Sequence, residues 1–324
     1  MKNSKHSNTT ISAYQYKMAD QTIIVTGGSQ GLGLELAKYH HNNDENAVII
    51  ILSRSEAKLI NACKKICNNT EFSKLEEFDT NKTRLYYHPI DLSNAGKVEN
   101  LLPLLAKLPT IQKTYLTAGG ASVKLFRDYS ISELQQGINM NYSSSLFLSH
   151  VLLKNELCKH LIYFSSEVSF FPFIGYSSYT PSKTSLKSLV NILRQEFPDC
   201  RLTNVFPGNF ASEGYAEENL TKPKITKDIE GSSKPISVEA CREIIINDIN
   251  KGYDDITTDF IGWVLMACDM GLNKNWNYSK FWFLQLILGV FANLIIIPIY
   301  MVILKYDINK YLRKAQVSDK TKKQ

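Results

Sequence analysis

The 324-residue sequence lacks the cysteine pattern of a disulfide framework or a zinc site. Its six cysteines are scattered, no two of them form a Cys-x-x-Cys pair, and no histidines stand with them at the spacing of zinc ligands. Such cysteine usage is typical of a reducing compartment. We therefore expect neither structural disulfides nor a metal site.

The sequence also lacks an excess of one charge over most of its length. The net charge is +6, but residues 305–324 hold seven Lys or Arg against two Asp, so the rest is about neutral. A nucleic-acid enzyme would spread basic residues over a folded face. The charge distribution therefore argues against a nucleic-acid partner, and it sets residues 305–324 apart as a basic tail.

Residues 1–20 contain no apolar run of signal-peptide length and are expected to form a short polar lead. We therefore do not expect the folded body to be exported. With 44% hydrophobic residues the chain has enough apolar side chains for a large buried core. The length of the body suits a single α/β domain.

Between residues 21 and 257, apolar runs typical of buried strands alternate with helical patterns. This alternation predicts an α/β domain, a doubly wound parallel sheet with crossover helices. Each run ends in small or polar residues, so the ligand site is expected at the carboxyl ends of the strands. The runs are TIIVTG (22–27), AVIIILSR (47–54), RLYYHPIDLS (84–93), KTYLTAGGA (113–121), KHLIYFSS (159–166) and CRLTNVFPGN (200–209).

Three connecting segments have patterns of their own. A polar helical pattern follows the second run as far as about Lys82. Residues 210–236 are polar, with glycines and prolines, and are expected to form a mobile loop. Residues 237–252 are amphipathic and predict a helix that ends at Gly252.

The sequence TGGSQGLG (26–33) joins the first expected strand to the first expected helix. Gly27, Gly31 and Gly33 allow a tight turn, close approach of the backbone to a pyrophosphate, and close packing of helix on strand. A glycine triplet alone is a weak signal, but this one stands between a strand and a helix. The pattern predicts a dinucleotide site, against the alternative of a plain tight turn.

The end of the second strand carries no carboxylate, which NAD-selective sites place there to hold the ribose 2′-hydroxyl. Ser53 and Arg54 stand at that position instead. A guanidinium pairs with a 2′-phosphate through two donors, so we expect NADPH as the cofactor. The alternative is that Arg54 is a solvated residue at a helix start. Asp91, which ends the third strand, is expected beside the adenine amino group.

Tyr179 and Lys183 stand four residues apart, on one face of an expected helix. A free tyrosine, with a pKa of about 10, is a poor proton donor near neutral pH, and a neighbouring ammonium is expected to lower that pKa. Such a pair also occurs by chance on protein surfaces. Ser166 ends an apolar run upstream, and Asn141 lies on the preceding helix, so both offer polar groups to the same site.

In order and spacing, these motifs closely resemble those of the short-chain dehydrogenase/reductase family, over roughly residues 20–255. The resemblance implies a Rossmann fold in which Tyr179 donates a proton and Ser166 orients a carbonyl group. It also implies that Lys183 binds the nicotinamide ribose and tunes Tyr179, and that Asn141 holds a water in the proton relay.

The same resemblance implies a set of cofactor-binding residues. One departure from the family is Thr117, which stands where the family has asparagine; it keeps a polar side chain, so we expect that wall of the site to survive. The implied residues are Gly27, Ser29, Gln30, Gly31, Leu32, Gly33, Ser53, Arg54, Asp91, Leu92, Ala118, Gly119, Tyr179, Lys183, Pro207 and Gly208.

Residues 204–215 and 258–266, joined to an apolar C-terminal stretch, resemble the fungal 3-ketodihydrosphingosine reductases. This narrower resemblance implies NADPH-dependent reduction of 3-ketosphinganine to sphinganine, at the endoplasmic reticulum membrane, with the catalytic domain facing the cytosol. A membrane-bound steroid or retinoid dehydrogenase would use the same residues, and a non-catalytic nucleotide-binding scaffold is a further alternative. The intact Ser166, Tyr179 and Lys183 argue against the scaffold. The oligomeric state, a homo-oligomer included, is left open.

Residues 281–304 contain no charge, and as a helix of about 36 Å they are long enough to cross a bilayer core of about 30 Å. We assign residues 21–257 to the catalytic domain, 258–304 to a membrane-associated region and 305–324 to the basic tail. A buried core or oligomer helix is the alternative for 281–304. Because the nucleotide fold is complete before residue 260, the C-terminal stretch is not expected to build the active site.

The topology of this stretch poses a conflict. The positive-inside rule places residues 305–324 in the cytosol, where the NADPH-binding body is also expected, and a single span does not satisfy both. A hairpin that turns near Asn293 to Pro298, or pairing with residues 260–272, would return the chain to the same side. We favour a hairpin or a shallow insertion.

Overall fold

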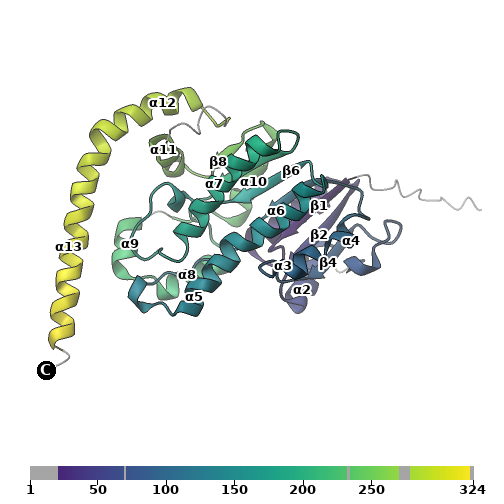
Figure 1. Cartoon of the computed structure of the whole chain (residues 1–324), viewed down its shortest axis with the longest axis horizontal. Helices are drawn as coiled ribbons and strands as arrows, with labels where there is room; N and C mark the ends of the chain where they lie inside the picture. Colours follow the sequence, from purple (N-terminus) through teal and green to yellow (C-terminus); the bar gives the residue numbers. More distant parts are fainter. Residues whose placement is uncertain (1–20, 69–70, 232–233, 270–277, 322–324) are drawn as a thin grey trace, which may run out of the picture.

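The computed structural model describes residues 21–68, 71–231, 234–269 and 278–321, and in these ranges eight parallel strands form one sheet. The strand order is β3-β4-β2-β1-β5-β6-β7-β8, so the connections run outward in both directions from β1 (Figure 1). This order confirms the doubly wound parallel sheet. The strands are β1 Gln21–Thr26, β2 Ala47–Ser53, β3 Ser73–Lys74, β4 Leu85–Pro89, β5 Thr110–Leu116, β6 His160–Phe164, β7 Arg201–Phe206 and β8 Asp255–Thr257.

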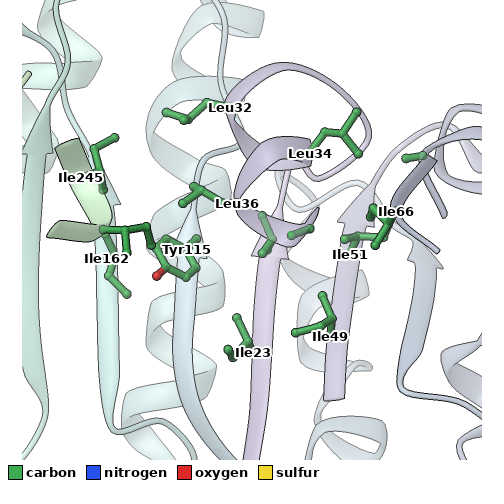
Figure 2. Packing of buried hydrophobic residues seen from close by; sticks show 14 of the residues in the cluster. Ile23, Leu32, Leu34, Leu36, Ile49, Ile51, Ile66, Tyr115, Ile162 and Ile245 are labelled. Carbon is green, nitrogen blue, oxygen red and sulfur yellow. The ribbon is translucent and has the colours of Figure 1, made fainter. Parts of the chain in front are cut away.

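Both faces of the sheet are covered by helices, so successive residues of a central strand are all buried. In β1, Ile23 and Val25 belong to one core cluster and Ile24 to the other. Burial on both faces explains why the strands have continuous apolar runs rather than alternating ones. One face is covered by α1 Gly31–Asn43, α2 Glu56–Ile66 and α10 Val238–Asn250 (Figure 2), and the other by α3 Ala95–Glu99, α4 Leu102–Leu105, α6 Ser144–Lys154 and α7 Thr180–Glu196.

The direction of winding changes between β1 and β5. Thr117, just after β5, closes this junction, because its hydroxyl donates to the carbonyl of Thr26 at the end of β1. The N–H of Ala118 in turn donates to the hydroxyl of Thr26 at 3.0 Å. A ligand crevice is expected at such a point in an open α/β sheet.

The helix after β2 is shorter than the sequence predicts. α2 ends at Ile66, and Asn68 adopts the left-handed conformation that commonly stops a helix. Farther along, the chain forms β3 and the short helix η1, Leu75–Glu77, instead of a helix to Lys82. Pairing of β3 with β4 at the sheet edge takes precedence over the helical propensity of this lysine-rich stretch.

The segment 210–236, which the sequence predicts as a mobile loop, contains two helices. α8 is Glu213–Thr221 and α9 is Lys224–Glu230. The side chain of Ser212 caps α8 by accepting a hydrogen bond from a backbone N–H of its first turn. The prediction of a loop was wrong because these helices carry no regular apolar stripe for the sequence to show.

The C-terminal region forms a helical arm (Figure 1). α11, Phe260–Cys268, packs against α12, Trp282–Phe291, which continues through the π-helical turn η6, Ala292–Ile296, into α13, Ile297–Thr321. The helix is therefore continuous where the sequence analysis favoured a hairpin turn, and that turn is not formed. Residues 260–268 of the segment proposed to pair with this stretch form α11, which contacts α12 but has only nine residues, too few for a second span, and residues 270–272 lie outside the described residues.

Asn293 and Pro298 both have roles inside this continuous helix. Pro298 has no N–H to donate, and the π-helical turn η6 lies just before it, where the chain bends without reversing (Figure 1). The side-chain amide of Asn293 donates to the carbonyl of Gly289 and to that of Cys268, each at 2.9 Å. Asn293 thus ties the arm to the end of α11 rather than marking a turn.

The helix from Trp282 to Lys314 is long and apolar enough, by length and composition, to cross a membrane. Its most apolar window has a mean hydropathy of 2.6, yet only 11% of that window is buried within the molecule. A core helix of a soluble protein would be mostly buried. This exposure removes the alternative of a buried core helix.

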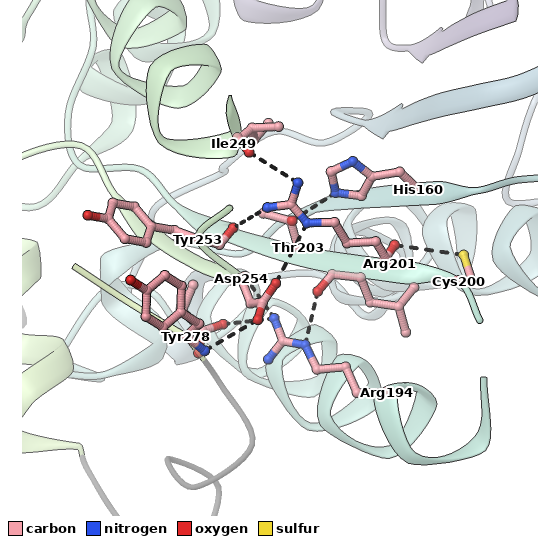
Figure 3. Close-up of polar contacts among 11 residues, drawn as sticks. His160, Arg194, Cys200, Arg201, Thr203, Ile249, Tyr253, Asp254 and Tyr278 are labelled. Carbon is pink, nitrogen blue, oxygen red and sulfur yellow. Dashed lines mark hydrogen bonds and ion pairs between the residues drawn. The ribbon is translucent and has the colours of Figure 1, made fainter. Parts of the chain in front are cut away.

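Two arginines fasten β8 and the start of the arm to the sheet (Figure 3). Arg194 on α7 donates to the backbone carbonyl of Asp254 at 2.8 Å and to the carboxylate of Asp255 at 3.1 Å. The N–H of Asp254 donates to the carbonyl of Tyr278 at 2.7 Å. Arg201 on β7 donates to the carbonyls that precede β8. The arm is therefore anchored through α7 to the nucleotide fold.

Candidate active site

The turn between β1 and α1 is shaped by its glycines. Gly27 and Gly31 have φ angles of +64° and +53°, which side-chain-bearing residues rarely adopt. A Cβ at Gly33 would lie 2.6 Å from the carbonyl oxygen of Gly27 and 2.7 Å from the hydroxyl of Thr117. No side chain caps the N-terminus of α1, where Gln30 is the N-cap residue. The turn therefore presents the free N–H groups of a helix N-terminus to the cleft, an arrangement that binds phosphate.

The end of β2 supplies positive charge to the same cleft. Arg54 is exposed, and Lys58, one turn farther on in α2, donates from its ammonium to the side chain of Gln30 at 3.1 Å. The hydroxyl of Ser53 is buried and has no hydrogen-bond partner among the described residues. Lys58 was missed by the sequence analysis, although its place one helical turn after Arg54 was a usable signal.

Asp91 faces this positive end from the end of β4. Its carboxylate accepts hydrogen bonds from the hydroxyl and the N–H of Ser93, at 2.7 and 3.0 Å. Burial raises the pKa of Asp91, but these hydrogen bonds and the charge of Arg54 outweigh burial and leave the pKa lowered. The carboxylate of Asp91 is therefore held in place by Ser93 and stays charged, so it can accept hydrogen bonds from a ligand in the cleft near Arg54.

Ser166, Tyr179 and Lys183 meet at the carboxyl end of β6. Tyr179 is the N-cap residue of α7, and its side chain is hydrogen-bonded to that of Ser166. Lys183, one turn farther along α7, is buried and donates from its ammonium to the carbonyl of Phe164 at 2.8 Å. The ammonium also lies 5.6 Å from the centroid of the Tyr179 ring. The structure thus brings together the three residues that the sequence places in one site.

The pKa of Tyr179 is raised rather than lowered. Burial is the largest cause, the carboxylate of Glu218 adds to it, and the hydrogen bond with Ser166 opposes it. The expected lowering by Lys183 is not found, because the ammonium is directed to the carbonyl of Phe164 and lies over the ring. Burial also lowers the pKa of Lys183 to about 8.

Asn141 lies in the π-helical turn η3, Asn139–Ser143, which links α5, Ile131–Ile138, to α6. Its amide accepts from the N–H of Gly120 at 3.0 Å and donates to the carbonyls of Gly120 and Gly137 at 2.9 and 3.0 Å. A Cβ on Gly119 would lie 2.9 Å from the Asn141 oxygen and 3.1 Å from the Lys183 ammonium. Asn141 therefore fixes the backbone against which Lys183 rests.

A buried charged cluster lies next to Tyr179, and the sequence analysis missed it. The ammonium of Lys222 lies 2.8 Å from a carboxylate oxygen of Glu218 and 2.6 Å from one of Glu230. The same Glu218 oxygen accepts from the hydroxyl of Tyr176 at 2.6 Å. This cluster joins α8 to α9 and holds both helices beside Tyr179.

All of the residues expected to form the site line one cleft of about 1660 Å³. They are Asn141, Ser166, Tyr179 and Lys183 together with Gly27, Ser29, Gln30, Gly31, Leu32, Gly33, Ser53, Arg54, Asp91, Leu92, Ala118, Gly119, Pro207 and Gly208. The cleft extends farther than these residues. Its other end is lined by Phe171, Phe173, Ile261, Leu265, Ile297 and Tyr300, so the C-terminal arm contributes to the site, contrary to the expectation from the sequence.

The polar end of the cleft fits a dinucleotide that carries an extra phosphate on a ribose. Free helix N–H groups suit a pyrophosphate, and the glycines leave room for its close approach. The guanidinium of Arg54 and the ammonium of Lys58 suit a phosphate, and the unpartnered hydroxyl of Ser53 suits a sugar or phosphate oxygen. Among the described residues, no group of three or more His, Cys, Asp or Glu side chains could hold a metal ion.

Comparison with known proteins gives matches in sequence. Residues 21–223 match the family model described as short chain dehydrogenase. The 3-ketodihydrosphingosine reductase of Kluyveromyces lactis is 48% identical over 304 residues, which cover 90% of this chain and 96% of that protein. The 3-ketodihydrosphingosine reductase of Saccharomyces cerevisiae is 43% identical over 317 residues, which cover 93% of this chain and 98% of that protein.

Solved structures with the same fold are more distant in sequence. An alcohol dehydrogenase from the archaeon Thermococcus sibiricus, complexed with 5-hydroxy-NADP, has a TM-score of 0.57 at 18% identity. The match covers 73% of this chain and 94% of the alcohol dehydrogenase. A short-chain dehydrogenase from Sphingobium yanoikuyae in complex with NADPH has a TM-score of 0.59 at 15% identity, with coverages of 73% and 86%. At these identities the likeness concerns the fold alone.

Proposed function

Because the chain belongs to the short-chain dehydrogenase family and is an oxidoreductase, we propose that it reduces 3-ketosphinganine to sphinganine with NADPH. The observation that carries this proposal is the identity of 40–48% to proteins named 3-ketodihydrosphingosine reductase, over at least 90% of the chain. That extent exceeds residues 21–223, which match the general family model. The likeness is therefore not confined to the nucleotide-binding fold.

The cofactor is assigned to the polar end of the cleft. The turn at Gly27 to Gly33 and the N-terminus of α1 hold the pyrophosphate, and Asp91 accepts from the adenine amino group. Arg54 and Lys58 bind the 2′-phosphate, which distinguishes NADPH from NADH. When bound, the cofactor supplies the hydride that reduces the ketone carbon.

Tyr179 is assigned the role of proton donor to the ketone oxygen, and Ser166 orients that oxygen through its hydroxyl. A raised pKa keeps the phenol of Tyr179 protonated before the reaction, as a donor requires. Lys183 binds the ribose hydroxyls, and with a pKa of about 8 it carries its charge at neutral pH. Asn141 bonds the backbone of Gly120 and so positions the adjoining Gly119 beside the Lys183 ammonium, while its part in a proton relay stays a prediction.

We assign the protein to the endoplasmic reticulum membrane, with the catalytic domain on the cytosolic side. The exposed apolar helix from Trp282 to Lys314 supports membrane association, and the scattered cysteine usage is consistent with a reducing compartment. Transferring about fifteen methylenes from a bilayer to water would cost about 12 kcal/mol, at roughly 0.8 kcal/mol each. An enzyme held at the membrane avoids that transfer.

A shallow insertion is the topology that we propose for the arm. The helix does not turn back, so a membrane-spanning arm would place the body and the basic end on opposite sides. A helix that lies in the plane of the interface leaves both on the cytosolic side. Tyr306 and Lys310 are residue types that favour this interface.

The function is tested with purified full-length protein in detergent or nanodiscs. We expect NADPH-dependent conversion of 3-ketosphinganine to sphinganine, identified by mass spectrometry, at a higher kcat/KM than for steroid or retinoid ketones. Faster turnover of a steroid or retinoid would replace the proposed substrate class. No turnover of any of these ketones would leave only a nucleotide-binding protein.

The catalytic assignment is tested with Tyr179→Phe. Because only the proton donor is lost, we expect kcat to fall by about 100-fold or more while the Kd for NADPH changes little. Tyr306→Phe removes a hydroxyl from the exposed arm and serves as the matched control. Near-normal turnover by Tyr179→Phe would assign the proton to another group.

A further inference from the structure

Helix α13 forms part of the wall of the catalytic cleft, although it lies more than a hundred residues beyond Tyr179 in the chain. Ile297, Tyr300 and Met301 line the same cleft as Tyr179. The ring of Tyr300 packs edge-on against Phe171, with the ring centroids 5.7 Å apart. Phe171 lies five residues after Ser166, so the arm directly contacts the loop that follows the catalytic serine.

The two faces of α13 differ in what they contact. Ile297, Tyr300 and Met301 stand three and four residues apart, which places them on one face of the helix, toward the cleft. Ile299 and Val302 lie on the remainder of α13 and are 60% and 71% exposed. The same short stretch of helix therefore borders the active site on one side and offers an apolar surface to lipid on the other.

The chemistry of the cleft changes along its length. The end near Arg54 and Asp91 is charged and polar, as a dinucleotide requires. The end near α13 is lined by aromatic and aliphatic side chains, and Phe171 stacks with Phe173 at 5.5 Å to form its inner wall. The volume of about 1660 Å³ also exceeds the roughly 300–1,000 Å³ of a site for one small ligand. The cleft has room for a cofactor and a long apolar substrate together.

We propose that the alkyl chain of the substrate lies between α13 and the segment Phe171–Phe173, having entered sideways from the membrane. The ketone then reaches Tyr179 while the chain stays against apolar side chains. In this arrangement α13 is a wall of the substrate site as well as a membrane anchor. This inference rests on the proposed function, because it takes a long-chain ketone to be the substrate.

The physical reason is continuity of the apolar surface. Each methylene that leaves lipid for water costs about 0.8 kcal/mol. A substrate whose alkyl chain had to cross water would therefore lose a large part of its binding free energy. A chain that slides from the lipid-facing side of α13 to its cleft-facing side avoids that loss. The helix thereby couples membrane attachment to substrate entry.

The test uses two tryptophan substitutions on the same helix. Ile297→Trp adds bulk inside the apolar end of the cleft, whereas Ile299→Trp adds the same bulk on the exposed side. Each variant is assayed in nanodiscs with 3-ketosphinganine and with a short, water-soluble amino ketone that has the same head group. The Kd for NADPH shows that the variants retain the nucleotide fold.

We expect Ile297→Trp to lower kcat/KM for the long-chain ketone by tenfold or more and to change that for the short ketone by less than twofold. Ile299→Trp should change neither by more than twofold. An equal loss on both ketones for Ile297→Trp would mean that α13 shapes the catalytic centre instead of holding the chain. If Ile297→Trp left kcat/KM for the long-chain ketone unchanged, the alkyl chain of the substrate would bind elsewhere.

A binding measurement separates this inference from the proposed function. A long-chain amino ketone with a photoreactive group in its alkyl chain should label Ile297, Tyr300 or Met301, and unlabelled 3-ketosphinganine should prevent that labelling. Labelling confined to exposed residues such as Ile299 and Val302, and insensitive to competition, would show only contact with lipid and would overturn the inference. If unlabelled 3-ketosphinganine prevented labelling of Ile297 but was not turned over, the binding site for the alkyl chain would be supported and the proposed reaction would not.

Discussion

Lys183 and Glu167, the residue after Ser166, both lie in the candidate site, and burial changes their pKa values in opposite directions. The pKa of Lys183 falls to about 8, whereas that of Glu167 rises to about 9. In both cases burial disfavours the charged form, which is the ammonium of one and the carboxylate of the other. Glu167 is also hydrogen-bonded to Asp259, whose negative charge raises its pKa further.

The stability of the protein should therefore fall as the pH rises through the neutral range. Glu167 has an ordinary pKa of 4.5 when unfolded and about 9 when folded, so between these values the folded state binds the additional proton. Stability from this group is full below about pH 4.5 and is lost progressively toward about pH 9. We expect Glu167→Gln to remove this slope, as measured by chemical denaturation of detergent-solubilised protein at several pH values.

The control for this effect is Glu243→Gln, because Glu243 is exposed on α10. That variant should keep the pH dependence of the parent. If Glu167→Gln showed the same decline in stability with pH as the parent, the proton would be held by a different group.

Arg54 and Lys58 are the residues that should decide the choice of cofactor. Arg54→Glu places a carboxylate beside the 2′-phosphate and removes a charged hydrogen bond, which is worth about 1.5–3 kcal/mol, or about ten- to hundredfold in affinity. We expect a loss of that order in kcat/KM for NADPH and little change for NADH. Lys64→Glu makes the same charge change at an exposed position near the end of α2 and should affect neither. Equal losses with both cofactors would remove Arg54 from the phosphate site.

At the scale of helices and strands, α7 connects the chemistry to the C-terminal arm. Its first turn carries Tyr179 and Lys183, and near its end Arg194 pairs with Asp255 of β8. Both side chains of this ion pair are about nine-tenths buried, at 11% and 9% exposed. A buried pair of this kind is costly to break from one side, because the remaining charge has no compensation.

Arg194→Met should therefore lower the free energy of unfolding by about 3 kcal/mol. Urea denaturation of the detergent-solubilised chain measures this loss. Gln195→Ala, at the neighbouring exposed position, should change the free energy by less than about 0.5 kcal/mol. A similar small change for Arg194→Met would mean that β8 and the arm are held by their backbone pairing alone.

The elements that the sequence predicts are those whose signal is local. Six strands have continuous apolar runs, and the turn at Gly27 to Gly33 has glycines where the backbone requires them. Helices α8 and α9 were missed because they carry no regular apolar stripe, and the ion pair of Lys222 with Glu230 that joins them depends on the tertiary structure. β3 and β8, with two and three residues, are too short to give a pattern. The contact of Tyr300 with Phe171 joins distant parts of the chain, so local patterns could not reveal it.

At the scale of the whole molecule, the proposed shallow insertion brings the body and the arm to the membrane together. A helix in the plane of the interface keeps the basic residues near Lys310 on the same side as the body. A spanning helix would place them across the bilayer. The two arrangements differ in which residues a membrane-impermeant reagent can reach.

Lys310→Cys in sealed microsomes distinguishes these arrangements. In a background with Cys200 and Cys268 replaced by Ser, we expect an impermeant maleimide to label this cysteine without detergent. Lys64→Cys, exposed on α2, should be labelled under the same conditions and reports the side of the body. Labelling of Lys310→Cys only after detergent, with Lys64→Cys labelled throughout, would establish a span. Protection of both would place the catalytic domain in the lumen.

The proposed entry of substrate from the membrane, along a helix that walls the cleft, has a kinetic consequence. The enzyme then samples its substrate in two dimensions, so its rate follows the mole fraction of substrate in the bilayer rather than the concentration in bulk solution. Added lipid that carries no substrate acts as a diluent and slows turnover, although the total amount of substrate is unchanged. Product that leaves by the same side opening returns to the leaflet from which the substrate came, where the next enzyme acting on the long-chain base can meet it by lateral diffusion.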